Sequence, residues 1–313
     1  YYGVDIVIEL PFHYATQSAD IFAKGSIEIL KELKVDNIVF GSECNDLESL
    51  IKNAKIILKN KNNNIKELLK EGMSYPKSFF NSLNIDTNTP NDILGILYIK
   101  EIIRQKTNIK PLTIKRTNDY HDTNLKEISS ATSIRMAIKE NKDISNSVPK
   151  NVLSYLYDIR FIEEYYEYLK YKIITTNNLS IYQGVDEGLE NRIKKYIYTS
   201  NTLEELIMNI KTKRYTYNKI KRMLLHILVD FTKVEALKYK DINYIRILGM
   251  TEKGKKYINR IKKDITIPII SNFNKYKDLL KLEYKSSLVY YLNSKNNNYN
   301  NLIKKEFNSI IIK

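Results

Sequence analysis

Short apolar runs alternate with longer helical patterns across the first half of the chain. The runs "VDIVIEL", "VDNIVFG" and "IKPLTIKR" have the length and the β-branched residues of buried strands. The stretches between them repeat their apolar residues at the spacing of one helix face. Strands that alternate with helices in this way predict an α/β fold, with a mostly parallel sheet that helices cover on both faces. In such sheets, ligands bind at the carboxyl ends of the strands.

Helices are expected at five places in this half, and Pro90 and Asn91 are start signals for the fourth. The expected ranges are residues 15–33, 45–58, 64–72, 91–105 and 131–141. From Val148 the pattern changes to consecutive helical stretches, and near the end a strand at "YIRILGM" precedes a helix and a strand-like "IPIIS". We therefore expect three units: an α/β domain over residues 1–147, a helical domain over residues 148–235, and a small α/β unit over residues 236–313.

Positive charge is concentrated in the second half of the chain. The formal net charge is +15. Residues 1–150 hold 21 Lys and Arg against 19 Asp and Glu, whereas the remainder holds 30 against 17. A lysine-rich codon bias would act evenly along the chain, so this asymmetry predicts a polyanionic partner for the second half.

Cysteine usage and hydropathy narrow the class of protein. Cys44 is the single cysteine, which excludes an internal disulfide framework or a cysteine-based zinc site and fits a cytoplasmic location. No run approaches the apolar length of a membrane span, no cluster suggests a protein-held metal, and no obligate protein partner is evident. Because Tyr1 begins within a strand pattern, we expect the chain to lack its natural N-terminal part.

The stretch "ISSATSIR", Ile128 to Arg135, lies where a strand–loop–helix junction is expected. Ser129, Ser130 and Thr132 could simply cap the helix that follows. Alternatively, the hydroxyl groups and backbone N–H groups could cradle a phosphate, with Arg135 about one helical turn beyond the cap to meet the anion. The spacing alone leaves both interpretations open.

This stretch resembles the Ile-Ser-Ser-Thr-x-x-Arg signature of HxGH-type nucleotidyltransferases, although Ala131 interrupts the Ser–Thr pair. The stretches "VIELPFHYATQSADIFAKG", "VDNIVFGSE", "TPNDILGILYI", "DEGLENRI", "KTKRYTYNKIKRMLLHIL" and "YIRILGMTEKGKKYI" extend the likeness over nearly the whole chain. In their order they resemble the tRNA(Met) cytidine acetate ligases. The resemblance implies a Rossmann-like nucleotidyltransferase domain, followed by a helical domain and a small C-terminal α/β unit.

By resemblance, that family activates acetate with ATP to acetyl-adenylate and pyrophosphate. It then transfers the acetyl group to N4 of the wobble cytidine in the anticodon region of elongator tRNA(Met). The cofactor expectations are ATP as a substrate and Mg²⁺ that arrives with ATP, bound largely through the phosphates. Catalysis would depend on positioning and on stabilising charge at the α-phosphate.

Three residues match family positions that contact ATP: Gly41 in "FGSE", Asn91 in "PND" and Arg116 after "IKPLTIK". Their ordinary alternatives are a turn glycine, a helix cap and a strand-end charge. Ser130, Thr132 and Arg135 follow the broader signature and are also expected at the ATP site.

The family's Pro-Phe-His-x-Gly-His motif is absent, and "PFHYATQ" only echoes it. By motif order it would lie upstream of Tyr1, so the catalytic histidines are expected there. His13 itself is expected to pack or to face solvent.

Lysine and arginine interleave with tyrosine in "KTKRYTYNKIKR", which we call the basic segment, Lys211 to Arg222. Cations beside aromatic rings suit phosphate contacts and base stacking on unpaired RNA, although a solvated helix face is the alternative. The residues expected to bind tRNA are Lys211, Lys213, Arg214, Tyr215, Lys219, Lys221 and Arg222.

Two rival functions remain open from the sequence. One is a small-metabolite adenylyltransferase of the same superfamily, which would leave the basic segment unexplained. The other is a non-catalytic RNA-binding protein, which the absent histidine motif would fit.

Overall fold

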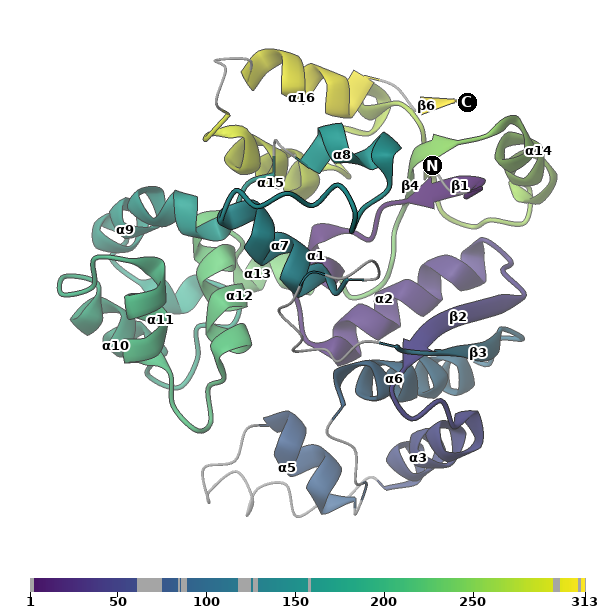
Figure 1. The fold of residues 1–313 in the computed structure, drawn as a ribbon, viewed down its shortest axis with the longest axis horizontal. Helices are drawn as coiled ribbons and strands as arrows, with labels where there is room; N and C mark the ends of the chain where they lie inside the picture. The colour runs from purple at the N-terminus through teal and green to yellow at the C-terminus, as the bar shows by residue number, and fades with distance from the viewer. Residues whose placement is uncertain are drawn as a thin grey trace.

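The computed structural model of this chain describes residues 3–60, 75–83, 85, 89–117, 125, 129–156, 159–294, 299–308 and 311–312 (Figure 1). The helix expected at residues 64–72 lies outside the described residues, as do Ile128 and residues 118–124, which follow the strand "IKPLTIKR".

Two parallel strands form the sheet of the first half. β2 (Asn37–Ser42) and β3 (Lys110–Lys115) pair in register from end to end. Among the described elements, one face of this pair is covered by helices α2 (Ala19–Glu32), α3 (Leu47–Lys59) and α6 (Pro90–Arg104). α6 packs between the other two helices.

Gly95 explains how closely α6 approaches the sheet. A Cβ atom at this position would lie 2.4 Å from the ring of Phe40 in β2, so only a glycine fits. Phe40 in turn packs on the core that includes Leu50 and Ile96. The opposite face differs from the prediction of two-sided coverage, because Val39 (55 % exposed), Leu112 (45 %) and Ile114 (62 %) lie on its surface.

β1 (Ile6–Ile8) is a strand as expected, but its partner differs from the prediction. It pairs antiparallel with β4 (Ile245–Met250) near the other end of the chain, rather than joining a parallel sheet with β2. β5 (Ile269–Ile270) and β6 (Ile311–Ile312) pair parallel to β4. The reason is a shared core, in which the isoleucines of β1 and β4 pack with α2 and with α14 (Glu252–Ile261).

Residues 162–237 form a helical region that lies between β3 and β4 in the sequence. It has the largest buried core of the described residues. Its α-helices are α9 (Tyr166–Thr175), α10 (Leu189–Tyr196), α11 (Leu203–Ile210), α12 (Tyr217–Leu228) and α13 (Lys233–Leu237). Its 3₁₀ turns are η1 (Ile162–Tyr165) and η2 (Leu179–Ile181). Leu206, Ile207, Ile220 and Leu224 are completely buried, in agreement with the helical spacing of the sequence.

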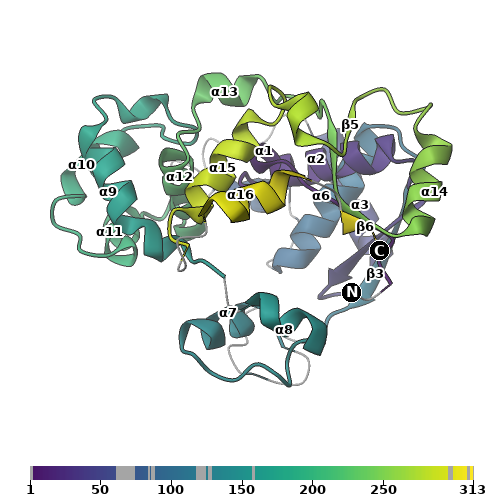
Figure 2. The same ribbon diagram turned by 90° about the horizontal axis from the view of Figure 1, so that it is seen from above.

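The remaining helices connect or cover these units. They are α1 (Phe12–Ala15), α5 (Tyr75–Ser82), α7 (Ala131–Lys139), α8 (Lys150–Leu156), α15 (Lys281–Tyr291) and α16 (Tyr299–Asn308), with the 3₁₀ turn η3 (Phe273–Tyr276). α7 and α8 lie apart from β2 and β3 in both views (Figure 2). Within the described residues, no helix is long and apolar enough to cross a membrane.

Candidate functional site

The carboxyl ends of β2 and β3 meet because the strands are parallel and in register. Arg116 continues the ladder, and its backbone N–H donates to the carbonyl of Ser42 (3.0 Å). A Cβ atom on Gly41 would lie 3.2 Å from Cγ of Arg116, so the glycine gives the arginine room to cross the strand. Nε of Arg116 is buried without a hydrogen-bond partner among the described residues. Arg116 as a whole is only half-buried, so the outer N–H groups of its guanidinium can bind an anion.

Glu43 joins the end of β2 to the start of α6. Its Oε1 accepts from Nδ2 of Asn91 (2.6 Å), and its Oε2 accepts from the backbone N–H of Asp92 (3.0 Å). A carboxylate only accepts hydrogen bonds, so the Asn91 amide must turn its nitrogen toward Glu43. The amide oxygen of Asn91 is then available to accept a hydrogen bond. A ligand that binds here must therefore donate an N–H or O–H group to it.

Asp92 makes the reciprocal contact with Glu43. Its carboxylate accepts from the backbone N–H of Glu43 (3.1 Å) and of Cys44 (3.0 Å), and from the hydroxyls of Thr89 (2.6 Å) and Ser42. The side chain is buried, and burial alone would raise its pKa. Hydrogen bonds from Ser42, Thr89 and Cys44 outweigh burial and hold the pKa of Asp92 below its ordinary value.

This strand edge combines positive charge with a hydrogen-bond acceptor. Lys115 is exposed there, and its Nζ donates to the carbonyl of Glu43 (2.6 Å). Arg116 follows Lys115 in the chain, and Asn91 contacts the same Glu43, so the edge can bind a ligand that has both an anionic group and a donor. A phosphorylated nucleoside has both.

The structure does not bring Ser130, Thr132 and Arg135 to this edge. Ser130 is the N-cap of α7, and its hydroxyl accepts from the backbone N–H of Ser133 (3.0 Å). Arg135 is exposed and reaches back to the hydroxyl of Thr132 (3.5 Å). Capping is therefore the role that the structure shows for Ser130, and α7 lies apart from β2 and β3 (Figure 2).

The basic segment begins in the loop between α11 and α12. Lys211, Lys213 and Arg214 are exposed there, and Arg214 forms an ion pair with Glu187 (2.6 Å). On α12, the remaining predicted cations are Lys219, Lys221 and Arg222, all half-buried. The first three cations are therefore the ones placed to meet a large polyanion.

The tyrosines of the basic segment differ from the prediction of stacking platforms. Tyr215 is only 7 % exposed, with Nζ of Lys219 at 4.5 Å from its ring centre, and its hydroxyl donates to Glu187. The hydroxyl of Tyr217 donates to Glu204 (2.5 Å). Both rings serve packing and hydrogen bonding within the helical region, so Tyr215 does not offer a face to a base.

His13 packs, as expected. It is 7 % exposed and stacks on Tyr239 with 5.6 Å between ring centres. Burial, followed by the neighbouring charges of His226 and Lys24, lowers the pKa of His13 to about 4, so the ring is neutral at neutral pH.

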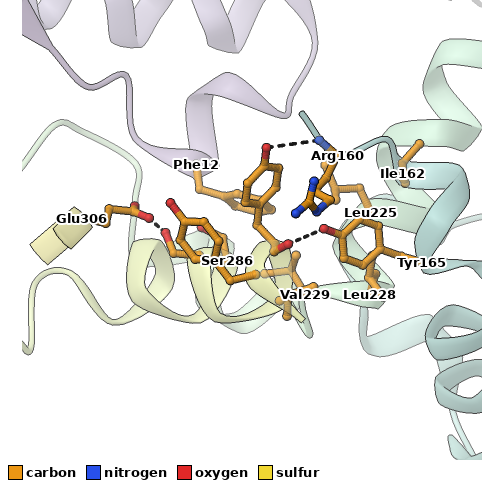
Figure 3. Close-up of a pocket in the computed structure, with 13 residues that line it drawn as sticks. Phe12, Arg160, Ile162, Tyr165, Leu225, Leu228, Val229, Ser286 and Glu306 are labelled. Carbon is orange, nitrogen blue, oxygen red and sulfur yellow. Dashed lines mark hydrogen bonds between the residues drawn. The ribbon is translucent and has the colours of Figure 1, made fainter. Parts of the chain in front are cut away.

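A cavity of about 480 Å³ lies where α1, α12 and α15 meet (Figure 3). Phe12 and Tyr165 line it, and the Tyr165 hydroxyl donates to the carbonyl of Tyr290, whose own hydroxyl accepts from the backbone N–H of Arg160 (3.3 Å). None of the three residues expected at the strand edge lines this cavity.

Sequence reasoning missed Glu43 and Asp92. Asp92 directly follows Asn91 in "PND", and Glu43 lies two residues after Gly41 in "FGSE". The available signal was a carboxylate at a strand end, followed later in the chain by another at a helix start. Their reciprocal contact depends on strand and helix meeting in space, which spacing does not encode.

Comparisons with known proteins show the family of this chain. A family model described as HIGH Nucleotidyl Transferase matches residues 1–305. The tRNA(Met) cytidine acetate ligase of Geobacillus sp. (strain WCH70) is 37 % identical over 92 % of this chain and 79 % of its own length. The enzyme of the same name from Bacillus subtilis (strain 168) is 38 % identical over 93 % of this chain and 77 % of its own.

Two solved structures are also similar. Thermotoga maritima TmcAL in its apo form has a TM-score of 0.89 at 27 % identity, over 99 % of this chain and 85 % of that one. TmcAL bound with alpha-thio ATP has a TM-score of 0.84 over the same shares.

The matching family model and the strand edge define the chain as a nucleotidyltransferase of the HIGH class, and the predicted α/β fold class is confirmed. Within that class, the chain belongs to the family of tRNA(Met) cytidine acetate ligases, as the resemblance implied, and it is a ligase.

Proposed function

We propose that this chain acetylates N4 of the wobble cytidine of elongator tRNA(Met), using acetate and ATP. The observation that carries the proposal is the meeting of Gly41, Asn91 and Arg116 at one strand edge, in a chain whose relatives bear that enzyme name. The Thermotoga maritima relative binds alpha-thio ATP, which supports ATP as the ligand of this edge. We infer that the reaction is cytoplasmic, where ATP, acetate and tRNA occur together.

The reaction has two steps. An acetate oxygen attacks the α-phosphorus of ATP, and pyrophosphate leaves as acetyl-adenylate forms. The cytidine N4 amine then attacks the acetyl carbonyl, AMP leaves, and the amine loses a proton. Adenylation is needed because acetate by itself has a poor leaving group.

Each residue has a role that its contacts allow. Arg116 holds a phosphate with its guanidinium, and Asn91 accepts a hydrogen bond from the adenosine through its free oxygen. Gly41 lets the nucleotide approach the strand. Ser130, Thr132 and Arg135 remain proposed triphosphate contacts, which requires α7 to approach the strand edge when ATP binds. Within the described residues, no cluster of carboxylates, histidines or cysteines could hold a metal ion, so Mg²⁺ would bind through the phosphates.

The helical region would hold the tRNA. Lys211, Lys213 and Arg214 are exposed and would contact phosphates, and Lys219, Lys221 and Arg222 would add positive potential behind them.

The test is incorporation of labelled acetate into tRNA by the protein, with ATP and magnesium present. Label that requires ATP and that migrates with acetylated cytidine after digestion supports the proposal. Pyrophosphate exchange that ignores acetate but responds to another small molecule would indicate the adenylyltransferase. tRNA binding without any exchange would indicate a non-catalytic RNA-binding protein.

A further inference from the structure

Glu43 lies just after β2, and both oxygens of its carboxylate bind the first turn of α6 (Figure 1). Oε1 accepts from Nδ2 of Asn91 (2.6 Å) and from the backbone N–H of Asn91 (3.4 Å), while Oε2 accepts from the backbone N–H of Asp92 (3.0 Å). The two backbone groups belong to the N-terminus of a helix, where a negative charge is favoured. These contacts hold the carboxylate in one place against α6.

The backbone of Glu43 is fixed as well. Its N–H donates to the Asp92 carboxylate (3.1 Å), and its carbonyl accepts from Nζ of Lys115 at the end of β3 (2.6 Å). Glu43 is thus held both by α6 and by β3. Because its backbone and its carboxylate are both held, Glu43 presents an acceptor to Asn91 in a fixed position.

The amide of Asn91 is oriented by this contact. Its nitrogen must face the Glu43 carboxylate, because a carboxylate only accepts hydrogen bonds. The amide oxygen has no partner among the described residues, and the side chain is half-buried, so a ligand at the strand edge can reach it. The second hydrogen of the amide nitrogen also remains. Asn91 therefore offers an acceptor beside a donor, in an order that Glu43 sets.

A fixed order of donor and acceptor matters most for the base of a nucleotide. A ribose hydroxyl both donates and accepts, so it would pair with the amide turned either way. The exocyclic amine of adenine donates, whereas guanine carries an acceptor oxygen at the same position. Asparagine pairs with adenine through this amine and a neighbouring ring nitrogen, which is the pattern that the Asn91 amide presents. The orientation that Glu43 imposes thus fits adenine and opposes guanine.

We propose that Glu43 makes the strand edge selective for adenine over purines with a carbonyl oxygen at position 6, by holding the Asn91 amide in one orientation. The inference rests on the proposed function, in which ATP binds at this edge. With its oxygen toward the ligand, Asn91 accepts from the adenine amine, whereas the carbonyl oxygen of guanine or hypoxanthine would meet a second acceptor. Glu43 is a positioning residue, since it acts on the nucleotide through Asn91.

The experiment compares ATP with ITP, whose base carries a carbonyl oxygen in place of the adenine amine. Dissociation constants for both nucleotides are measured at one magnesium concentration with the unchanged protein, Glu43→Gln, Asn91→Ala and Glu48→Gln. Glu48→Gln makes the same chemical change at an exposed residue of α3 and is the matched control. Melting temperatures show whether each variant is folded, and acetate-dependent pyrophosphate exchange shows whether the bound nucleotide is a substrate.

In Glu43→Gln the preference is expected to reverse. The backbone N–H of Asp92 can only donate, so the glutamine keeps its oxygen there and turns its nitrogen toward Asn91. The Asn91 amide then turns its own oxygen to the glutamine and presents its nitrogen to the ligand. This orientation suits the carbonyl oxygen of ITP and opposes the amine of ATP.

The unchanged protein and Glu48→Gln are expected to bind ITP at least about fivefold more weakly than ATP, since ITP leaves two acceptors facing each other. Glu43→Gln is expected to bind ITP at least as tightly as ATP. Asn91→Ala has no amide and is expected to bind both nucleotides alike.

A preference for ATP that persists in Glu43→Gln or in Asn91→Ala would overturn the inference, and so would equal binding of ATP and ITP by the unchanged protein. In each of these cases, acetate-dependent exchange with ATP would leave the proposed function standing. If the unchanged protein neither binds ATP nor catalyses the exchange, the proposed function falls and the inference falls with it.

Discussion

Glu43 and Asp92 hold each other's backbone. The Glu43 carboxylate accepts from the Asp92 N–H at 3.0 Å, and the Asp92 carboxylate accepts from the Glu43 N–H at 3.1 Å. This pair fixes the end of β2 against the start of α6, and the same Glu43 carboxylate orients the amide of Asn91. The positions of Gly41 and Asn91 therefore depend on two carboxylates that bond to the protein itself.

Replacing Asp92 by Asn should destabilise the fold and change its response to acid. The new amide would place donors against groups that donate already, which costs about 1–3 kcal/mol in the free energy of unfolding. The lowered pKa of Asp92 means that its contribution is present above its unfolded pKa, about 3.9, and is lost as the pH falls through its folded pKa. Chemical denaturation between pH 7 and pH 3 measures both effects.

Asp92→Asn should therefore lose stability at neutral pH and lose less on acidification than the unchanged protein. Glu48→Gln is the control, since Glu48 is exposed in the next helix. Equal acid sensitivity in Asp92→Asn and the unchanged protein would contradict this role of the carboxylate.

Replacing Arg116 by Ala should suppress acetyl-adenylate formation. Loss of one donor to a charged transition state commonly lowers kcat by about a hundredfold. Acetate-dependent pyrophosphate exchange is the measurement, and Lys110→Ala at the other end of β3 is the control because it removes an exposed charge from the same strand. Normal exchange in Arg116→Ala would remove Arg116 from the site.

The strands and helices of the first half could be predicted because local apolar spacing determines them. β2, β3 and α6 appear where their patterns lie, and the parallel register then brings Gly41 and Arg116 together. The partner of β1 could not be predicted. A buried-strand pattern indicates that β1 pairs with another strand, but it does not indicate which one. β4, more than two hundred residues away, supplies it.

The same limit explains the tyrosines of the basic segment. Interleaved cations and rings predicted stacking surfaces, yet Tyr215 gives its hydroxyl to Glu187, which precedes it by 28 residues. Whether an aromatic residue faces solvent depends on which distant acceptor the fold brings to it. The exposed cations of the loop could be predicted, because a charged side chain stays in solvent without needing a distant partner from the fold.

Ser130 allows a test that separates capping from phosphate binding. Ser130→Ala should lower the stability of α7 by about 1 kcal/mol, because its hydroxyl caps the helix. Ser130→Asp should keep the cap, since aspartate is an equally good N-cap residue, but would repel a triphosphate. If Ser130 contacts ATP in our proposal, the aspartate variant should bind ATP more weakly than Ser130→Ala does, although its buried charge is expected to lower the melting temperature because Ser130 is only 8 % exposed. Unchanged ATP affinity in Ser130→Asp would indicate that Ser130 caps α7 and does not contact ATP.

Removing charge from the basic segment should weaken tRNA binding and spare adenylation. Lys213→Ala combined with Arg214→Ala removes two exposed cations, so the plot of log affinity against log salt should become shallower by about one to two units. Lys213 should account for more of the loss, because Arg214 is already paired with Glu187 (2.6 Å).

The matched control removes the same charge elsewhere, by Lys256→Ala with Lys263→Ala, at two exposed residues in and just after α14. If net charge alone governed binding, both double variants would weaken tRNA equally and flatten the salt dependence alike. A larger loss in the Lys213 and Arg214 variant, with acetate-dependent pyrophosphate exchange unchanged, would assign the RNA contact to the loop between α11 and α12. An unchanged affinity and salt slope would make the basic segment an ordinary solvated surface.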